Sequence, residues 1–297
     1  VSFMLSWLWT VLGESGPQAL TKAWKKGEQM IVTYPPDWIP GTYAKYHPLS
    51  FSWLVGGIVR RACKDGKGIN HHLHSRVCAP LGIDPSELTI GELPPKYDVH
   101  VARLEGKSFR KLCQLSPIWK SALGVFESFV FCTVGNLRRW RELCLPSSNA
   151  LWTPDAVAKM YAALSNDGAI ACEEKKEKRA FSRGSIKKLW NKLHQPPIPG
   201  ANGPARLSLG FCPWVTPSLH GPSSIHRRIV CHNGMGGCIA FGELKGENSE
   251  TSSLAVAIGK NSYDPSVCIG LSPVSPSSVE LVEAIRRGIR KADAFTA

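Results

Sequence analysis

The hydrophobic periodicity of this chain changes once, near residue 205. Before that point apolar residues recur at helical spacing, and after it short β-rich runs alternate with polar segments that contain glycine. This order predicts an α/β (α+β) fold, in which a mainly helical region over residues 1–205 precedes an antiparallel sheet and a C-terminal helix over residues 206–297. A length of 297 residues suits one large domain that contains both regions.

Local signals place the individual elements. The clearest helix signal runs from Thr153 to Gly168, because Thr153 is an N-cap residue, Pro154 suits the first helical position and Gly168 ends the pattern. Inside the helix predicted over residues 50–61, the pair Gly56-Gly57 would let another element pack closely. Further helices are predicted over residues 17–32, 70–78 and 277–291, a surface connection over residues 84–100, and strands over residues 207–211, 228–231, 237–242 and 253–259.

The chain is strongly basic, with 36 Lys and Arg against 23 Asp and Glu and a net charge of +13. Such an excess can indicate a nucleic-acid partner. The basic residues, however, occur in scattered pairs and form no stripe with interleaved aromatic residues. Solvated helix faces therefore explain the charge better, and we expect no nucleic-acid partner.

The ten cysteines form no Cys-x-x-Cys pair and show no zinc-like spacing with histidine. We therefore expect no metal and no cofactor. Thiols in apolar contexts are typical of a reducing compartment, which favours the cell interior without naming an organelle. Only Cys231 and Cys238 are placed so that they could pair. No run of eighteen apolar residues predicts a membrane span, and the apolar residues 1–13 lack the charged start of a signal peptide.

Two distant segments carry candidate site residues. Residues 231–241 combine a strand pattern with a glycine-rich stretch and contain His232. Residues 40–54 form a Pro-Gly loop that contains Tyr46 and leads into a helix. Taken singly, each has a plain structural explanation: a tyrosine beside a loop, a packed histidine, and a glycine-rich turn or bulge.

In combination, these segments resemble two of the three active-site motifs of the serine β-lactamase and penicillin-binding-protein superfamily, especially the esterases related to class C β-lactamases. Pro146-Ser147-Ser148-Asn149 before the Thr153 helix and Leu209-Gly210-Phe211 are also similar to that family. The resemblance covers residues 20–291 and implies a β-lactamase/transpeptidase-like fold. It further implies a serine hydrolase that cleaves a small-molecule ester or amide through an acyl-enzyme.

The resemblance also implies roles for individual residues. Tyr46 would be the acid/base group of the acyl transfer, and His232 would form the polar edge of the site. Asn233, Gly234 and Met235 would bind the substrate, with Gly234 allowing close approach and the Met235 amide contacting the oxyanion.

The sequence departs from the family at two places. Pro48 stands where many members have an asparagine two residues after the tyrosine. The nucleophile motif Ser-x-x-Lys, which the family carries well upstream of the tyrosine, is absent before Tyr46. The matches Ser108–Lys111 and Ser185–Lys188 both follow Tyr46, in the wrong order.

Three functions stay open. The first is a hydrolase represented by a chain that is incomplete at its N-terminus and inactive alone. The second is a non-catalytic module of the same fold that binds a ligand or a protein partner. The third is a basic nucleic-acid-binding protein, which only the net charge supports.

Overall fold

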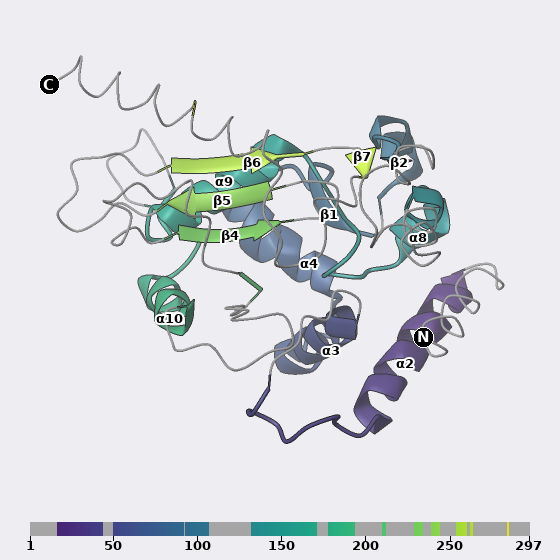
Figure 1. The fold of residues 1–297 in the computed structure, drawn as a ribbon. Coiled ribbons are helices and arrows are strands. Elements are labelled where there is room, and N and C mark those ends of the chain that lie inside the picture. The colour runs from purple at the N-terminus through teal and green to yellow at the C-terminus, as the bar shows by residue number, and fades with distance from the viewer. Residues whose placement is uncertain are drawn as a thin grey trace, which may run out of the picture. The chain divides into compact units, whose positions relative to one another are not determined.

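The computed structural model describes residues 17–43, 50–91, 93–106, 132–170, 178–193, 210–211, 229–233, 239–243, 254–259, 262–263 and 284. The chain divides into two compact units. The first unit comprises residues 1–42 and 47–152, and the second comprises residues 43–46 and 153–297. Helices dominate the first unit, and a three-stranded sheet with helices forms the described part of the second (Figure 1).

The first unit contains short helical and extended elements in sequence. They are the helices α2 (Pro17–Thr33), α3 (Ser50–Cys63) and α4 (Ile69–Leu73), the π-helix η1 (His74–Cys78), α5 (Ala79–Leu81), β1 (Leu88–Ile90), the 3-10 helix η2 (Pro95–His100), β2 (Glu105–Gly106), α8 (Arg138–Glu142) and β3 (Ala150–Trp152). Strands β1 and β3 pair in antiparallel fashion, with Thr89 opposite Leu151. Residues 84–100, predicted as a surface connection, therefore include a buried strand and a 3-10 helix.

Helices α2 and α3 pack through a reciprocal exchange of tryptophans and glycines. Trp53 of α3 occupies the space that a side chain at Gly27 would fill, and Trp24 of α2 occupies the space beside Gly56. A Cβ added at Gly56 would lie 2.7 Å from the Trp24 ring. The two indole rings lie 6.5 Å apart at 48°. The predicted close packing at Gly56-Gly57 is confirmed.

Ion pairs also join α2 and α3 at this interface. Glu28 of α2 accepts hydrogen bonds from Arg60 and Arg61 of α3, with 2.9 Å between Arg60 Nη2 and Glu28 Oε2. The Arg60 guanidinium also lies 5.1 Å from the centre of the Trp24 ring. Burial of Glu28 raises its pKa, but the hydrogen bonds and positive charges of Arg61 and Arg60 outweigh burial, so the pKa lies below its ordinary value.

The predicted helix over residues 70–78 continues further than expected. The chain runs from α4 through the π-helix η1 into α5 and ends at Gly82, whose φ of +63° suits glycine. Pro80 lies within this path although proline has no N–H to donate. The wider π turn immediately before Pro80 accommodates the missing hydrogen bond, which explains why the helix does not stop there.

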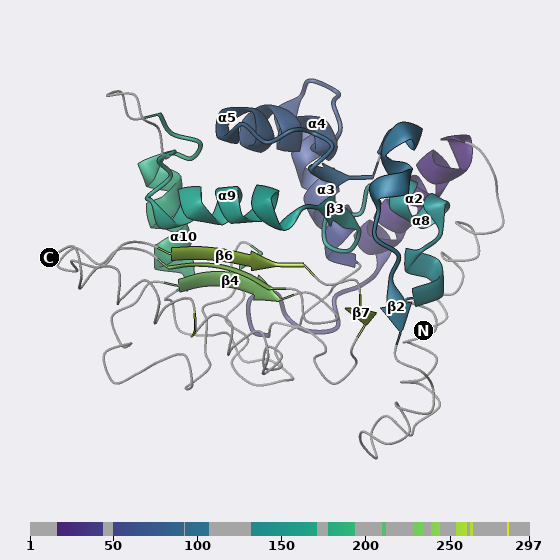
Figure 2. The same cartoon turned by 90° about the horizontal axis from the view of Figure 1, so that it is seen from above.

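The second unit contains α9 (Pro154–Ser165), α10 (Arg183–Leu193), β4 (Ile229–Asn233), β5 (Ile239–Glu243), β6 (Leu254–Ile258) and β7 (Ser262–Tyr263). The strand order is β4-β5-β6, and both pairings are antiparallel. Helix α9 lies along one face of this sheet, as both views show (Figure 1, Figure 2). The helix begins as predicted, because Thr153 Oγ1 accepts a hydrogen bond of 3.2 Å from Ala156 N.

Small residues let α9 approach the sheet. Ala240 and Gly242 of β5 share a face, and their partners on β6 are Ala257 and Ala255. A Cβ added at Gly242 would lie 2.9 Å from the carbonyl oxygen of Tyr161 on α9. The opposite face is also covered, because Cys231 and Phe241 are almost fully buried there. Of the predicted C-terminal helix over residues 277–291, only residue 284 is described.

Candidate active site

The structure describes part of the predicted site. His232 lies on β4, and the backbone of Asn233 ends that strand. Tyr46, Gly234 and Met235 lie outside the described residues. Their roles remain those that the resemblance implies.

Strand register fixes the face on which His232 lies. His232 is opposite Ala240, and Val230 is opposite Gly242. Directly paired residues of antiparallel strands share a face, so His232 lies on the face that α9 covers. Val230 is completely buried, whereas His232 is half-buried. The imidazole therefore lies where the covered face becomes accessible to solvent.

The strand that carries His232 is the outer strand of the described sheet. β4 pairs with β5 on one side, and no described strand pairs with its other side. An outer strand presents backbone N–H and C=O groups that can pair with an extended ligand. A half-buried imidazole beside such an edge can donate or accept a hydrogen bond. This combination can bind a polar carbonyl compound, but the described residues place no serine nucleophile beside it.

The Ser185–Lys188 match is an exposed surface feature of α10. Ser182 Oγ accepts a hydrogen bond of 3.1 Å from Ser185 N, which satisfies a free N–H at the start of the helix. Ser185 Oγ lies 2.9 Å from Ser182 Oγ, and both Ser185 and Lys188 are exposed. An exposed serine beside a solvated lysine lacks the desolvated setting that activates a nucleophile. Ser108 lies outside the described residues.

The segment Pro146–Asn149 has a positioning role that the sequence did not reveal. Asn149 is buried, and its amide nitrogen donates hydrogen bonds to the carbonyls of Trp140 and Leu143 while its Oδ1 accepts one from Leu145 N. Its three bonds fold the backbone over residues 140–149. Asn149 bonds the backbone of three residues in the core cluster that contains Trp53. Because its partners are backbone groups, which any residue type carries, the sequence offers no signal for this role.

The segment Pro146–Asn149 also forms hydrogen bonds with the first turn of α3. Ser147 N donates a hydrogen bond of 3.1 Å to Ser52 Oγ, and the two serine hydroxyls also contact each other. Ser52 is completely buried. The helix that follows the tyrosine segment in the chain is thus tied to Pro146–Asn149. Two segments that each resemble the family are therefore physically joined at this point.

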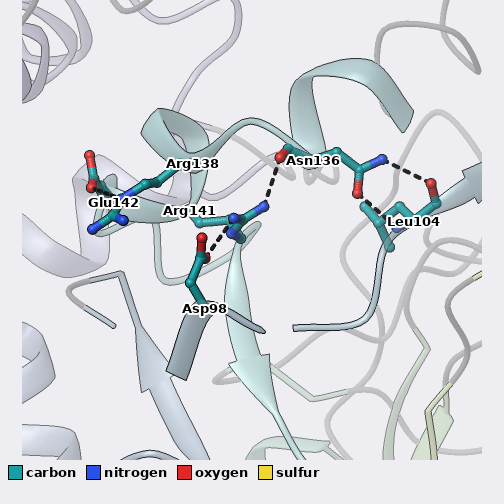
Figure 3. A network of polar contacts seen from close by, with 6 residues as sticks. All are labelled: Asp98, Leu104, Asn136, Arg138, Arg141 and Glu142. Carbon is teal, nitrogen blue, oxygen red and sulfur yellow. Dashed lines mark hydrogen bonds and ion pairs between the residues drawn. The ribbon is translucent and has the colours of Figure 1, made fainter. Parts of the chain in front are cut away.

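A second polar network joins residues 98–104 to residues 136–142 of the first unit (Figure 3). Arg141 pairs with Asp98 at 2.6 Å and donates to the Asn136 carbonyl at 2.7 Å. The Asn136 side chain bonds both the N–H and the carbonyl of Leu104 at 2.8 Å. A groove of about 820 Å³ lies beside this network and includes Cys132. Burial raises the pKa of the Cys132 thiol, which disfavours the reactive thiolate form.

Among the described residues, no group of three or more His, Cys, Asp or Glu side chains is arranged to hold a metal ion. In the same part of the chain, no helix combines the length and the apolar character that crossing a membrane requires.

Comparison with known proteins identifies the family. The model of the beta-lactamase family matches residues 11–261, so the chain belongs to the beta-lactamase family. Among solved structures, it is similar to EstA from Arthrobacter nitroguajacolicus Rue61a, with a TM-score of 0.61 and 16% sequence identity. The match covers 95% of this chain and 68% of EstA. The search of curated proteins gave no match.

These comparisons confirm the predicted family and fold class. The fold is the β-lactamase/transpeptidase-like fold of a serine β-lactamase-related protein, with helices and antiparallel sheet. At 16% identity the likeness to EstA concerns the fold alone.

Proposed function

We propose that this chain is a β-lactamase-related serine hydrolase domain for a small-molecule ester or amide, and that it has little or no turnover by itself. The observation that supports the proposal is the position of His232, on the outer strand of the described sheet within a chain of this family. In the proposed site Tyr46 transfers the proton, and His232 and Asn233 form the polar edge. Gly234 and the Met235 amide accommodate the substrate carbonyl.

The missing nucleophile explains the proposed lack of turnover. Acyl transfer needs a serine whose hydroxyl is activated by a nearby base. No Ser-x-x-Lys precedes Tyr46, and the match at Ser185 is solvent-exposed. Without a nucleophile, oxyanion and proton-transfer groups can bind a carbonyl compound but cannot form an acyl-enzyme.

The test is hydrolysis of a simple p-nitrophenyl ester by the 297-residue chain and by its Tyr46→Phe variant. We expect both proteins to release p-nitrophenol at the same rate, close to that of an equal concentration of the heat-denatured chain. A rate that falls in Tyr46→Phe while the variant remains folded would overturn the proposed inactivity and would support a nucleophile elsewhere in the chain.

The alternative is a non-catalytic binding module of the same fold. The outer position of β4 in the described sheet favours it, because the edge of an outer strand can receive an extended ligand or a protein segment. Calorimetric titration with a β-lactam distinguishes the two functions. Saturable binding without hydrolysis that is lost in His232→Ala supports the binding module, and absence of saturable binding counts against it.

A further inference from the structure

A polar pocket in the first unit is lined by none of the residues assigned to hydrolysis. It has a volume of about 580 Å³ and is formed by α4, η1, β1, η2 and the loops between them. Its polar lining includes Asn70, His71, His74, Asp84, Lys96 and Tyr97. This volume falls within the range of small-molecule sites in proteins. The proposed hydrolytic function leaves the pocket unexplained.

Asn70 aims hydrogen-bond donors into this pocket. The residue is 95% buried, since only 5% of its surface is exposed, and it lines the cavity. Its Oδ1 accepts a hydrogen bond of 3.0 Å from Ile90 N and lies 3.2 Å from Thr89 Oγ1. Because Ile90 N can only donate, these contacts fix which end of the amide is oxygen. The amide nitrogen donates no hydrogen bond within the described residues and is not one of their fully buried unpartnered atoms, so it is accessible from the pocket and can donate to an acceptor on a ligand.

Cationic and imidazole groups surround the same cavity. The Lys96 ammonium lies 4.7 Å from the centre of the Tyr97 ring, which keeps it beside the pocket. His74 Nε2 donates a hydrogen bond of 3.1 Å to the Leu88 carbonyl, so its Nδ1 is the nitrogen left for other contacts. His71, one helical turn earlier, is exposed at the rim.

One oxygen of the pocket's carboxylate, Asp84, already accepts hydrogen bonds within the chain. Asp84 Oδ1 accepts hydrogen bonds from Ser86 N at 2.7 Å and from Ser86 Oγ at 2.6 Å. These bonds stabilise the turn and lower the pKa of Asp84, with a smaller contribution from Lys96. Asp84 therefore stays ionised, and its other oxygen can accept a hydrogen bond from a ligand hydroxyl or amine.

We propose that this pocket binds a small ligand through an oxyanion group, a carboxylate or a phosphate, held by the Asn70 amide and the Lys96 ammonium. His74 begins the π-helix η1, and π turns occur frequently at functional sites. The oxyanion supplies the acceptor that the Asn70 amide lacks. The ammonium of Lys96 balances its charge, and Asp84 receives a donor group carried by the same ligand.

The test is a nuclear magnetic resonance titration of the 15N-labelled full chain with inorganic phosphate, and separately with sodium acetate, at constant ionic strength set by sodium chloride. We expect saturable shifts of the Asn70 side-chain amide and of backbone amides over residues 70–97. Stronger binding of phosphate or of acetate identifies the preferred oxyanion. The readout requires no turnover, so it is independent of the proposed hydrolytic function.

Two variants and a matched control decide the assignment. Asn70→Asp keeps an oxygen for Ile90 N but replaces the donor nitrogen with a second oxygen, and Lys96→Gln removes the charge. Each is expected to weaken binding about tenfold, the loss typical of one hydrogen bond to a charged group. Lys67→Gln, an exposed lysine outside the pocket, makes the same change in net charge and is expected to bind as the unaltered chain does.

The proposal is overturned by absence of saturable shifts with both anions. It is also overturned by an equal loss of affinity in Lys96→Gln and Lys67→Gln, which would indicate general attraction of anions to a basic surface. If Asn70→Asp fails to fold, the comparison of the two lysine variants alone decides the outcome.

Discussion

Two interfaces, one in each unit, achieve close packing by different means. Between α2 and α3, a glycine on each helix makes room for a tryptophan side chain of the other. Between α9 and the sheet, Gly242 makes room for the Ser165 side chain and also for the backbone of α9 itself, at the Tyr161 carbonyl. Side chains can rotate when crowded, whereas a helix backbone cannot move without breaking its hydrogen bonds. The second interface should therefore tolerate less change at its glycine than the first.

Removing the central side chain of the α2–α3 interface has the largest expected effect. Trp53 is 1% exposed and belongs to the core cluster of the first unit. Trp53→Ala is expected to lower the free energy of unfolding by about 3–5 kcal/mol, measured by urea denaturation. Phe51→Ala, an aromatic residue on the exposed face of the same helix, is the control. An equal loss in both variants would contradict the assigned packing of α3.

Adding one carbon at each glycine compares the interfaces directly. Gly242→Ala is expected to lower the free energy of unfolding by about 1–3 kcal/mol, because the new Cβ meets the Tyr161 backbone carbonyl as well as the Ser165 hydroxyl. Gly56→Ala is expected to cost less, because the Trp24 ring can shift and alanine favours a helix by about 1 kcal/mol. Urea denaturation measures both.

A control for the glycine series comes from α10. Gly184 is exposed, and the nearest atom to an added Cβ is 3.9 Å away. Gly184→Ala should therefore be neutral or stabilising. A larger cost at Gly56 than at Gly242 would show that the contrast between side-chain and backbone packing is wrong.

The charged contact at Glu28 adds a pH dependence to the first interface. Since the pKa of Glu28 in the folded chain lies below its unfolded value, its contribution is present above the unfolded value and is lost as pH falls through the folded value. At pH 7, Glu28→Gln is expected to cost about 1 kcal/mol, because the arginines are partly exposed. The difference from the unaltered chain should shrink at pH 3.

The matched control is Glu142→Gln on α8. Glu142 makes only an exposed ion pair with Arg138 one helical turn away. We expect a cost below about 0.5 kcal/mol at pH 7. A Glu28 effect that does not change between pH 7 and pH 3 would mean that packing, rather than charge, makes the contribution.

The smallest expected effect concerns the serine that faces Gly242. Ser165 Oγ is buried and has no hydrogen-bond partner among the described residues. Ser165→Ala removes an unsatisfied polar atom, so the free energy of unfolding should stay constant or rise by up to about 1 kcal/mol. A loss above 1 kcal/mol would show that the hydroxyl contributes to stability. A Cβ at position 242 would meet the Ser165 hydroxyl. The double variant Gly242→Ala with Ser165→Ala should therefore be more stable than Gly242→Ala alone.

Local signals predicted the elements that depend on local chemistry. The Thr153 cap, the strands around β4 and β6, and the close approach at Gly56 all follow from short patterns. The buried bonds of Asn149 depend on tertiary contacts, so no pattern in the sequence could reveal them. The π turn before Pro80 was not predicted because proline ordinarily signals the end of a helix. For the site, the strand of His232 was predicted, but its register against Ala240 needed the structure.

The most direct test of the account is labelling of the 297-residue chain with a fluorescent phosphonate that reacts with nucleophilic serines, followed by peptide mapping. A competent serine hydrolase in the same reaction serves as the positive control. We expect no labelled serine in this chain, because no Ser-x-x-Lys precedes Tyr46 and the described residues place no serine nucleophile beside His232. Labelling of a single serine that requires the folded state would contradict it and would locate the nucleophile.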